Sequence, residues 1–282
     1  MRKNTLLISL SFLIFFLLHQ ATLTTSSEEK ALPPSEDTAH AALEKSPRHG
    51  EYVDIKVPGS QTSIKTWVVY PERKDKAPVI VVIHEIFGLS EWIRAVTDQL
   101  AKDGFIGVAP DLISGKGPGG GNTDSVASRD ELIKLVRGLT LDETSARLNA
   151  VYDYGLKIPA GNKKIATIGF CWGGTASFLY AAQQPGLSAA VVYYGTSPET
   201  AALAGIKAPV LGLYGENDAR VNSTIDAASA EMKKLGKSYE VEIFKGAGHA
   251  FLRAQSGQDG ANLKATESAW PRMLQFLRKY TS

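Results

Sequence analysis

The residue best suited to covalent chemistry is Cys171, the only cysteine of the chain. It lies in Gly169-Phe170-Cys171-Trp172-Gly173-Gly174, between an apolar run and a helical pattern. This is the G-x-S-x-G strand–turn–helix pattern of hydrolytic nucleophiles, with Cys in place of Ser. Glycines two residues either side leave room for neighbouring backbone, and a helix N-terminus stabilises a thiolate or an oxyanion. A lone cysteine is more often a buried structural residue, but this flanking pattern favours a nucleophile.

A cysteine nucleophile needs a base, usually histidine, and a carboxylate can orient that base. His249 follows the last predicted strand in a Gly-Ala-Gly-His turn, and Asp218 follows the strand before it. The C-terminal ends of parallel strands are where such sheets place catalytic groups. The chain order Cys171, Asp218, His249 is the nucleophile–acid–histidine order of hydrolases built on a parallel sheet. Glu216, in the same turn as Asp218, is an alternative acid.

The elements that must position these residues follow from apolar periodicity. Segments 53–57 and 63–70 predict two antiparallel strands, and the continuous apolar run 78–84 predicts a strand buried on both faces of a parallel sheet. Strand and helix patterns then alternate, which predicts a mostly parallel sheet covered on both faces. Further strands are expected at 105–109, 165–170, 189–194, 210–214 and 239–244, and helices at 90–103, 128–138, 141–156, 175–184, 224–235 and 263–280.

A glycine-rich stretch, residues 113–123, interrupts this alternation. It lacks the GxxxxGK[ST] pattern, and no strand–helix junction carries G-x-G-x-x-G, so a phosphate cradle is not expected. A mobile active-site loop or a plain connector fits the sequence.

The first residues have the features of an export signal. Met1-Arg2-Lys3 precedes an apolar stretch over 6–18, and small residues follow at 21–27. We expect a signal peptide over 1–26, a polar linker over 27–50 and one domain over 51–282, in a periplasmic or secreted protein. The alternative is an uncleaved anchor, although the stretch is short for a membrane span and would give the only membrane contact.

Composition excludes several classes of protein. The 282 residues carry 31 Lys and Arg against 29 Asp and Glu, a net charge of +2 that does not favour nucleic-acid binding. One cysteine permits neither an intrachain disulfide nor a cysteine-based metal cage. We expect a monomer that acts on a small molecule, with no cofactor, no metal and no nucleic-acid partner.

The chain resembles the dienelactone hydrolase (carboxymethylenebutenolidase) family, which has the α/β-hydrolase fold. The resemblance covers about residues 51 to 281. It is carried by His84-Glu85-Ile86-Phe87-Gly88-Leu89, Ile93-Arg94, Val108-Ala109-Pro110-Asp111-Leu112, Gly169-Phe170-Cys171-Trp172-Gly173-Gly174, Gly215-Glu216-Asn217-Asp218 and Gly246-Ala247-Gly248-His249-Ala250-Phe251. It implies a sheet of about eight strands and hydrolysis of an ester or enol-lactone.

The resemblance also implies roles for four side chains. Cys171 would be the nucleophile that forms a thioester, His249 the base and Asp218 the group that orients it. Glu85 would be an additional carboxylate that pairs with the thiol and helps to ionise it, which burial makes feasible by raising its pKa. Alternatively, Glu85 only positions its turn.

Other matching positions would bind the substrate. The backbone N–H groups of Ile86 and Trp172 would form the oxyanion hole, and Arg253 would bind a substrate carboxylate. A solvated surface arginine is the alternative for Arg253. The family's second arginine has Arg129 as the only nearby candidate. His84 is expected to be structural and, without H-E-x-x-H, not a zinc ligand.

Three other functions compete with a dienelactone-like hydrolase. A general carboxylesterase or thioesterase would use the same residues. A non-catalytic, exported binding protein would need none of them, so the complete set of three favours an enzyme. A redox-sensing thiol would call for a resolving cysteine, which the sequence lacks.

Overall fold

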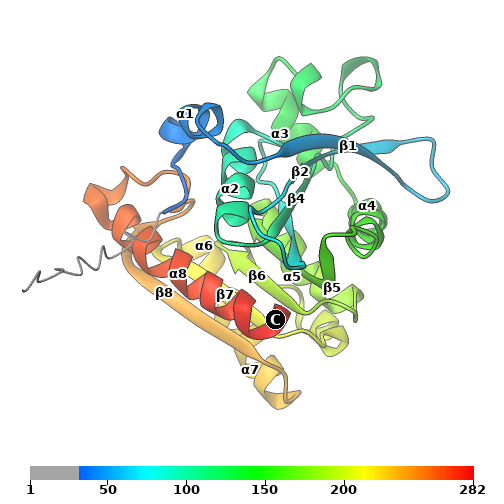
Figure 1. Ribbon diagram of the computed structural model, residues 1–282. Helices are drawn as coiled ribbons and strands as arrows, with labels where there is room; N and C mark the ends of the chain where they lie inside the picture. The colour runs from blue at the N-terminus through cyan, green and yellow to red at the C-terminus, as the bar shows by residue number, and fades with distance from the viewer. Residues whose placement is uncertain (1–31) are drawn as a thin grey trace, which may run out of the picture. The chain divides into compact units, whose positions relative to one another are not determined.

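A computed structural model describes residues 32–282, and in this range the chain forms one eight-stranded sheet (Figure 1). The strand order is β1-β2-β4-β3-β5-β6-β7-β8. β1 pairs with β2 and β2 with β4 in antiparallel fashion, and all other pairs are parallel. The strands are β1 Gly50–Lys56, β2 Ser63–Val69, β3 Ala77–Ile83, β4 Ile106–Pro110, β5 Gly161–Phe170, β6 Ala189–Tyr193, β7 Val210–Asn217 and β8 Tyr239–Gly248.

Helices cover both faces of this sheet and enclose two cores. β3 shows why its apolar run is continuous: Ile80 and Val82 belong to one core, Val79 and Val81 to the other. The first core is shared with α2 and α8, and the second with α3, α4, α5 and α7. The helices are α1 Ala39–Glu44, α2 Glu91–Lys102, α3 Arg129–Arg137, α4 Leu141–Gly155, α5 Trp172–Gln183, α6 Ala219–Asn222, α7 Ile225–Lys234 and α8 Ala261–Thr281.

The predicted strands and helices of the body are all present; β1 begins earlier than expected, at Gly50, and three of the parallel strands are longer than expected. β5 begins at Gly161, β7 ends at Asn217 and β8 ends at Gly248. These extensions pair with neighbouring strands, for example Asn217 with Gly248, although their residues are polar or small. The mostly parallel α/β architecture predicted from the sequence is confirmed.

The segment before β1 corrects one expectation. Residues 32–49 were expected to be part of a polar linker, but they fold against α2. The indole Nε1 of Trp92 donates to the Pro34 carbonyl at 3.0 Å, and the guanidinium of Arg48 forms an ion pair with Asp98 at 2.5 Å. Both side chains of that ion pair are only 10% exposed, so these polar residues form a buried contact between the segment and α2. The predicted signal peptide, 1–26, lies outside the described residues.

The described residues contain no helix that is both long and apolar enough to cross a bilayer. The longest of these helices, α8, contains Pro271 and packs its apolar side, which includes Trp270, Met273 and Phe276, into the core shared with α2.

Candidate active site

Cys171 occupies a strained turn between β5 and α5. Its φ of 54° and ψ of −115° lie outside the regions that non-glycine residues normally adopt. Its backbone N–H donates to the Tyr193 carbonyl at 3.0 Å. A Cβ on Gly173 would lie 2.3 Å from the Ile83 carbonyl oxygen, and one on Gly169 would lie 1.9 Å from the Gly173 oxygen. Glycine is therefore required on both sides of the cysteine, as the motif predicts.

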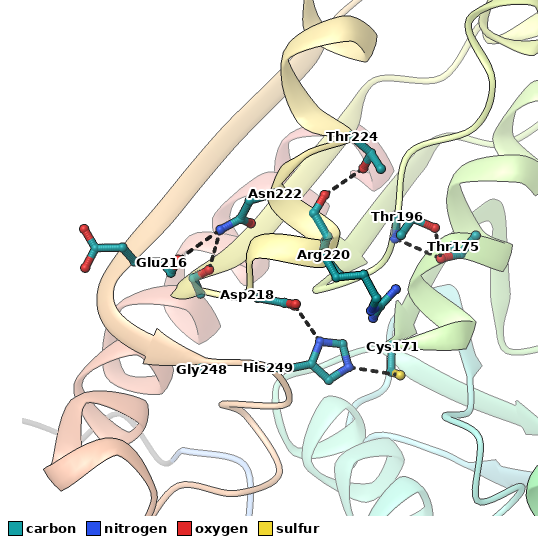
Figure 2. A network of polar contacts seen from close by, with 12 residues as sticks. Cys171, Thr175, Thr196, Glu216, Asp218, Arg220, Asn222, Thr224, Gly248 and His249 are labelled. Atoms are coloured by element: carbon teal, nitrogen blue, oxygen red, sulfur yellow. Dashed lines mark hydrogen bonds and ion pairs between the residues drawn. The ribbon is translucent and has the colours of Figure 1, made fainter.

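Three side chains that are distant in sequence meet at this turn (Figure 2). His249 Nε2 lies 3.1 Å from Cys171 Sγ, and His249 Nδ1 lies 2.5 Å from Asp218 Oδ2. Cys171, Asp218 and His249 follow β5, β7 and β8, whose C-terminal ends share one edge of the sheet. The sulfur, the imidazole and the carboxylate form a continuous hydrogen-bonded chain, the arrangement that nucleophilic catalysis requires.

The imidazole of His249 is tuned by these contacts. Burial by itself disfavours the charged ring, but the hydrogen bonds to Asp218 and Cys171 outweigh it and raise the pKa of His249 to about 9. The ring is therefore positively charged at neutral pH, beside the sulfur. Asp218, only 7% exposed, accepts from Nδ1 and fixes the orientation of the ring.

The alternative acid has a different partner. Glu216 accepts the backbone N–H of Gly246 at 2.8 Å and thereby connects the two turns that carry Asp218 and His249. Asn217 strengthens this connection, because its side-chain amide donates to the Gly246 carbonyl at 3.0 Å. Of the two acids in this turn, Asp218 is the one that contacts the imidazole.

Glu85 lies at the site but pairs with an arginine rather than with the thiol. Its Oε2 is 2.8 Å from Arg253 Nε, and its Oε1 is buried without a hydrogen-bond partner. Burial raises the pKa of Glu85 to about 7, although the nearby Arg253 and His249 charges act in the opposite direction. The structure thus differs from the expected Glu85–Cys171 contact: the hydrogen-bond partner of the sulfur is His249.

Arg253 is not a solvated surface residue. Its side chain is 17% exposed and forms a second ion pair with Glu36, which belongs to the segment before α1. The guanidinium carbons of Arg253 and Arg129 lie 5.4 Å and 4.0 Å, respectively, from the centroid of the Phe87 ring. Both candidate substrate-binding arginines therefore lie beside the same aromatic ring. The guanidinium of Arg253 is already paired with the carboxylates of Glu36 and Glu85.

The expected oxyanion donors occupy suitable backbone positions. Trp172 is the first residue of α5, where an N–H has no acceptor within the helix. The N–H of Ile86 has no acceptor among residues 32–282. His84 holds this region as a structural residue: its Nε2 accepts from the Leu112 N–H at 3.1 Å, and its Nδ1 donates to the Glu85 carbonyl at 2.7 Å. Burial lowers the pKa of His84, in keeping with a neutral ring.

The glycine-rich stretch is fixed to the site rather than loose. The buried carboxylate of Asp111 accepts the backbone N–H groups of Ile113 at 3.2 Å and Thr123 at 2.8 Å. The hydroxyl of Thr123 in turn accepts the N–H of Leu89 at 3.0 Å, directly after the Glu85 turn. These bonds make the stretch an anchored connector, which the sequence left open.

Tyr194 is a site residue that the sequence analysis did not single out. It follows β6, has a φ of 41°, and packs edge-on against His249 with ring centroids 5.2 Å apart. Its hydroxyl is buried and unpartnered, and burial raises the pKa of this phenol. Its place at the C-terminal end of a predicted parallel strand was the signal that could have identified it.

An apolar cleft is lined in part by Trp172, the residue that follows the nucleophile. It has a volume of about 130 Å³ and runs between α4 and α5, with Leu139, Leu148, Trp172 and Leu179 among its walls. Across the described part of the chain, no group of three or more His, Cys, Asp or Glu side chains could hold a metal ion. The chemistry of this edge is that of a thiol, an imidazole and carboxylates.

Comparisons with known proteins identify the family of the chain. Residues 64–281 match the profile of the dienelactone hydrolase family. A Methylorubrum extorquens protein described as "Putative carboxymethylenebutenolidase" is 30% identical over 250 residues, which cover 80% of each chain. An Escherichia coli K12 protein with the same description is 28% identical over 237 residues, covering 79% of this chain and 85% of its own.

Solved structures show the same similarity. A crystal structure described as "Putative Dienelactone Hydrolase" from Klebsiella pneumoniae superimposes with a TM-score of 0.72 at 28% identity, covering 83% of this chain and 99% of that one. An acylaminoacyl peptidase of Pyrococcus horikoshii shares the fold alone, with a TM-score of 0.64 at 17% identity, and covers 86% of this chain but 43% of its own.

Proposed function

Because the chain belongs to the dienelactone hydrolase family of carboxylic ester hydrolases, we propose that it cleaves an ester or enol-lactone through a cysteine acyl-enzyme. The observation that carries this proposal is the hydrogen-bonded chain from Cys171 through His249 to Asp218. A thiolate suits activated esters, since it leaves a tetrahedral amide adduct more easily than an amine does.

The first half of the reaction forms the acyl-enzyme. The Cys171 thiolate attacks the carbonyl carbon, a C–S bond forms, and the carbonyl electrons move to the oxygen. The backbone N–H groups of Ile86 and Trp172 bind this oxyanion, each donor contributing about 2.7–4 kcal/mol to lowering the barrier. The C–O bond then breaks, and the imidazolium of His249 gives its proton to the leaving oxygen. The product of this half is a thioester on Cys171.

The second half releases the acid. Neutral His249 accepts a proton from water, the resulting hydroxide attacks the thioester carbonyl, and the same two N–H groups bind the new oxyanion. The C–S bond breaks and the thiolate returns to its place beside the imidazolium. Asp218 keeps the ring in one orientation throughout, since its carboxylate holds Nδ1 at 2.5 Å.

Glu85 is a second acid–base group of this site. A carboxyl group with a pKa of about 7 can hold or release a proton under working conditions, and its unpartnered Oε1 has capacity for one more hydrogen bond. Because Arg253 forms an ion pair with Glu85, a change at the arginine alters the pKa of this carboxyl group directly.

The test is a comparison of Cys171→Ala with the unchanged protein on 4-nitrophenyl acetate. We expect the variant to lose at least about 10³-fold in kcat/KM, since the sulfur of Cys171 is the nucleophile that contacts His249. Thermal unfolding of both proteins controls for folding. Full turnover by a folded Cys171→Ala variant would overturn the proposal.

We further propose that residues 1–26 are an export signal, in keeping with the basic start and the apolar stretch over 6–18. The protein would then act in the periplasm or outside the cell. Mass spectrometry of the protein isolated from its source tests this. Cleavage near residue 26 is expected, and an intact N-terminus would contradict the signal peptide and favour the uncleaved anchor.

A further inference from the structure

The guanidinium of Arg253 is held between two carboxylates from distant parts of the chain. Its Nε lies 2.8 Å from Glu85 Oε2, and its Nη1 forms an ion pair with Glu36. The backbone joins in, since the Glu36 N–H donates to the Arg253 carbonyl at 2.9 Å. Glu36 therefore contacts Arg253 through both its side chain and its main chain.

The position of Glu36 is set by the fold of the segment that carries it. The Pro34 carbonyl accepts the indole N–H of Trp92 at 3.0 Å, and the Pro33 carbonyl accepts the side-chain amide of Gln255 at 2.9 Å. These contacts fix the chain on both α2 and the turn after His249. The carboxylate of Glu36 is consequently a built-in neighbour of Arg253.

Arg253 is close enough to the reacting groups to influence a substrate. Its Nε is 2.8 Å from Glu85 Oε2 and its guanidinium carbon is 5.4 Å from the centroid of the Phe87 ring, so it lies against the turn that carries Ile86. A guanidinium that is only 17% exposed is screened less than a surface charge. If it were unpaired, it would attract a carboxylate on the substrate, because its planar fork matches that group.

We propose that Glu36 is a specificity-determining residue: it occupies Arg253, so that the enzyme prefers uncharged esters to esters that carry an additional carboxylate. This inference rests on the proposed ester hydrolysis. The substrate class it names is a neutral ester with a small apolar group. The cleft between α4 and α5, with its walls of Leu139, Leu148 and Leu179, offers an apolar surface beside Trp172 for such a group.

Two other arginines could attract anions, and both are exposed. Arg129 stacks on Phe87, and Arg220 extends from α6 toward Cys171 and His249 in Figure 2. The attraction between solvated charges is worth about 0–1 kcal/mol. Their influence is therefore weaker than that of the partly buried Arg253, and Arg220→Gln serves as a comparison.

The experiment compares two substrates of similar length, neutral 4-nitrophenyl butyrate and anionic mono-4-nitrophenyl succinate. For Glu36→Gln we expect kcat/KM to rise about tenfold on the anionic ester and to change less than about twofold on the neutral one. Glu44→Gln is the matched control: Glu44 lies in the same segment and pairs with the exposed His40. It should leave the ratio of the two substrates unchanged.

A binding measurement makes the result independent of turnover. Succinate should raise the melting temperature of Glu36→Gln more than that of the unchanged protein, because only the variant leaves a side of Arg253 free. An unchanged substrate ratio together with no added succinate effect would overturn the inference. So would a ratio that responds to Arg220→Gln but not to Glu36→Gln.

Failure of the proposed function would look different. If the unchanged protein hydrolysed neither ester, or if Cys171→Ala retained turnover, the cysteine mechanism would be wrong whatever Glu36 did. If both esters were hydrolysed through Cys171 and Glu36→Gln behaved like Glu44→Gln, only the role of Glu36 would be lost.

Discussion

The proton on His249 depends on partners from two other strand ends. Asp218 supplies the carboxylate and Cys171 the sulfur, and together they hold the imidazolium against the cost of burial. At neutral pH, the site thus combines a charged ring with an adjacent sulfur. Because the pKa of His249 is higher in the folded chain than in the unfolded one, protonation of the ring stabilises the fold. This stabilisation is complete below the ordinary pKa of 6.5 and is lost as the pH rises through about 9.

Replacing Asp218 by Asn should change this pH dependence. The acylation rate of the unchanged protein should fall as the pH rises through about 9, where the imidazolium loses its proton. Without the carboxylate the ring is a weaker base, so in Asp218→Asn the decline should begin at lower pH, with kcat/KM reduced by at least about 10²-fold. The profile of kcat/KM against pH on an aryl ester measures both effects.

Glu216→Gln is the matched control for that measurement. Glu216 stands in the same turn and binds the Gly246 N–H, without touching the ring. Its high-pH limb should stay near 9; an equal shift in both variants would show that the turn, and not the Asp218 carboxylate, sets the pKa of His249.

At the level of elements, the strand ends and one turn determine where the site lies. β3 supplies Glu85 and Ile86 just beyond its end, and α5 begins directly after Cys171. The two approach so closely that the first turn of α5 leaves no room for a Cβ at Gly173. The distance between the two expected oxyanion donors therefore depends on this contact, because Ile86 follows β3 and Trp172 begins α5.

Gly173→Ala should separate β3 from α5. The added methyl would meet the carbonyl oxygens of Ile83 and His84 at 2.3 and 2.4 Å. We expect a loss of about 2 kcal/mol in the free energy of unfolding. We also expect kcat to fall by a larger factor than KM changes, since the Ile86 and Trp172 N–H groups would move apart. Urea unfolding and steady-state kinetics measure the two effects.

A control glycine lies at the end of α3. A Cβ on Gly138 would be 3.1 Å from the Lys134 carbonyl, a contact that a small shift relieves. Gly138→Ala should therefore change stability by less than about 1 kcal/mol and leave kcat unaltered. Equal effects of the two substitutions would mean that the elbow tolerates a side chain.

The sequence predicted the strand centres, the elbow and the residues at three strand ends, because each is encoded by a local pattern. The juxtaposition of Cys171, Asp218 and His249 also follows from sequence, since parallel strands bring their C-terminal ends to one edge. The extension of β5 back to Gly161 was missed because strand pairing, not apolar alternation, defines it. The Glu36–Arg253 pair spans 217 residues and has no local signature.

Across the whole molecule, the segment before β1 connects parts that the sheet alone does not connect. It touches α2 through Trp92 and the turn after His249 through Arg253. Its main anchor is the Arg48–Asp98 ion pair, in which Asp98 also accepts the Ser46 hydroxyl at 2.6 Å. A charged pair this well buried is costly to break from one side, because the remaining charge has no solvent to replace its partner.

Arg48→Met should therefore lower the free energy of unfolding by about 3 kcal/mol, measured by urea titration. Lys65→Met is the control, because its pair with Asp124 is exposed, with 33% and 64% of the two side chains accessible. Its effect should stay below about 1 kcal/mol. A loss in Arg48→Met that is as small as the one expected for Lys65→Met would show that the segment contributes little to global stability.

The separation of Cys171 from its base along the chain has a consequence for folding. The two are 78 residues apart, and His249 follows β8, which pairs with β7 at the edge of the sheet that residues 32–282 form. Closing so long a loop costs chain entropy, which the contacts of the docked strands offset. We therefore expect Cys171 to gain its base only when β8 docks and brings His249 to the sulfur. The appearance of fast alkylation during refolding would time that docking.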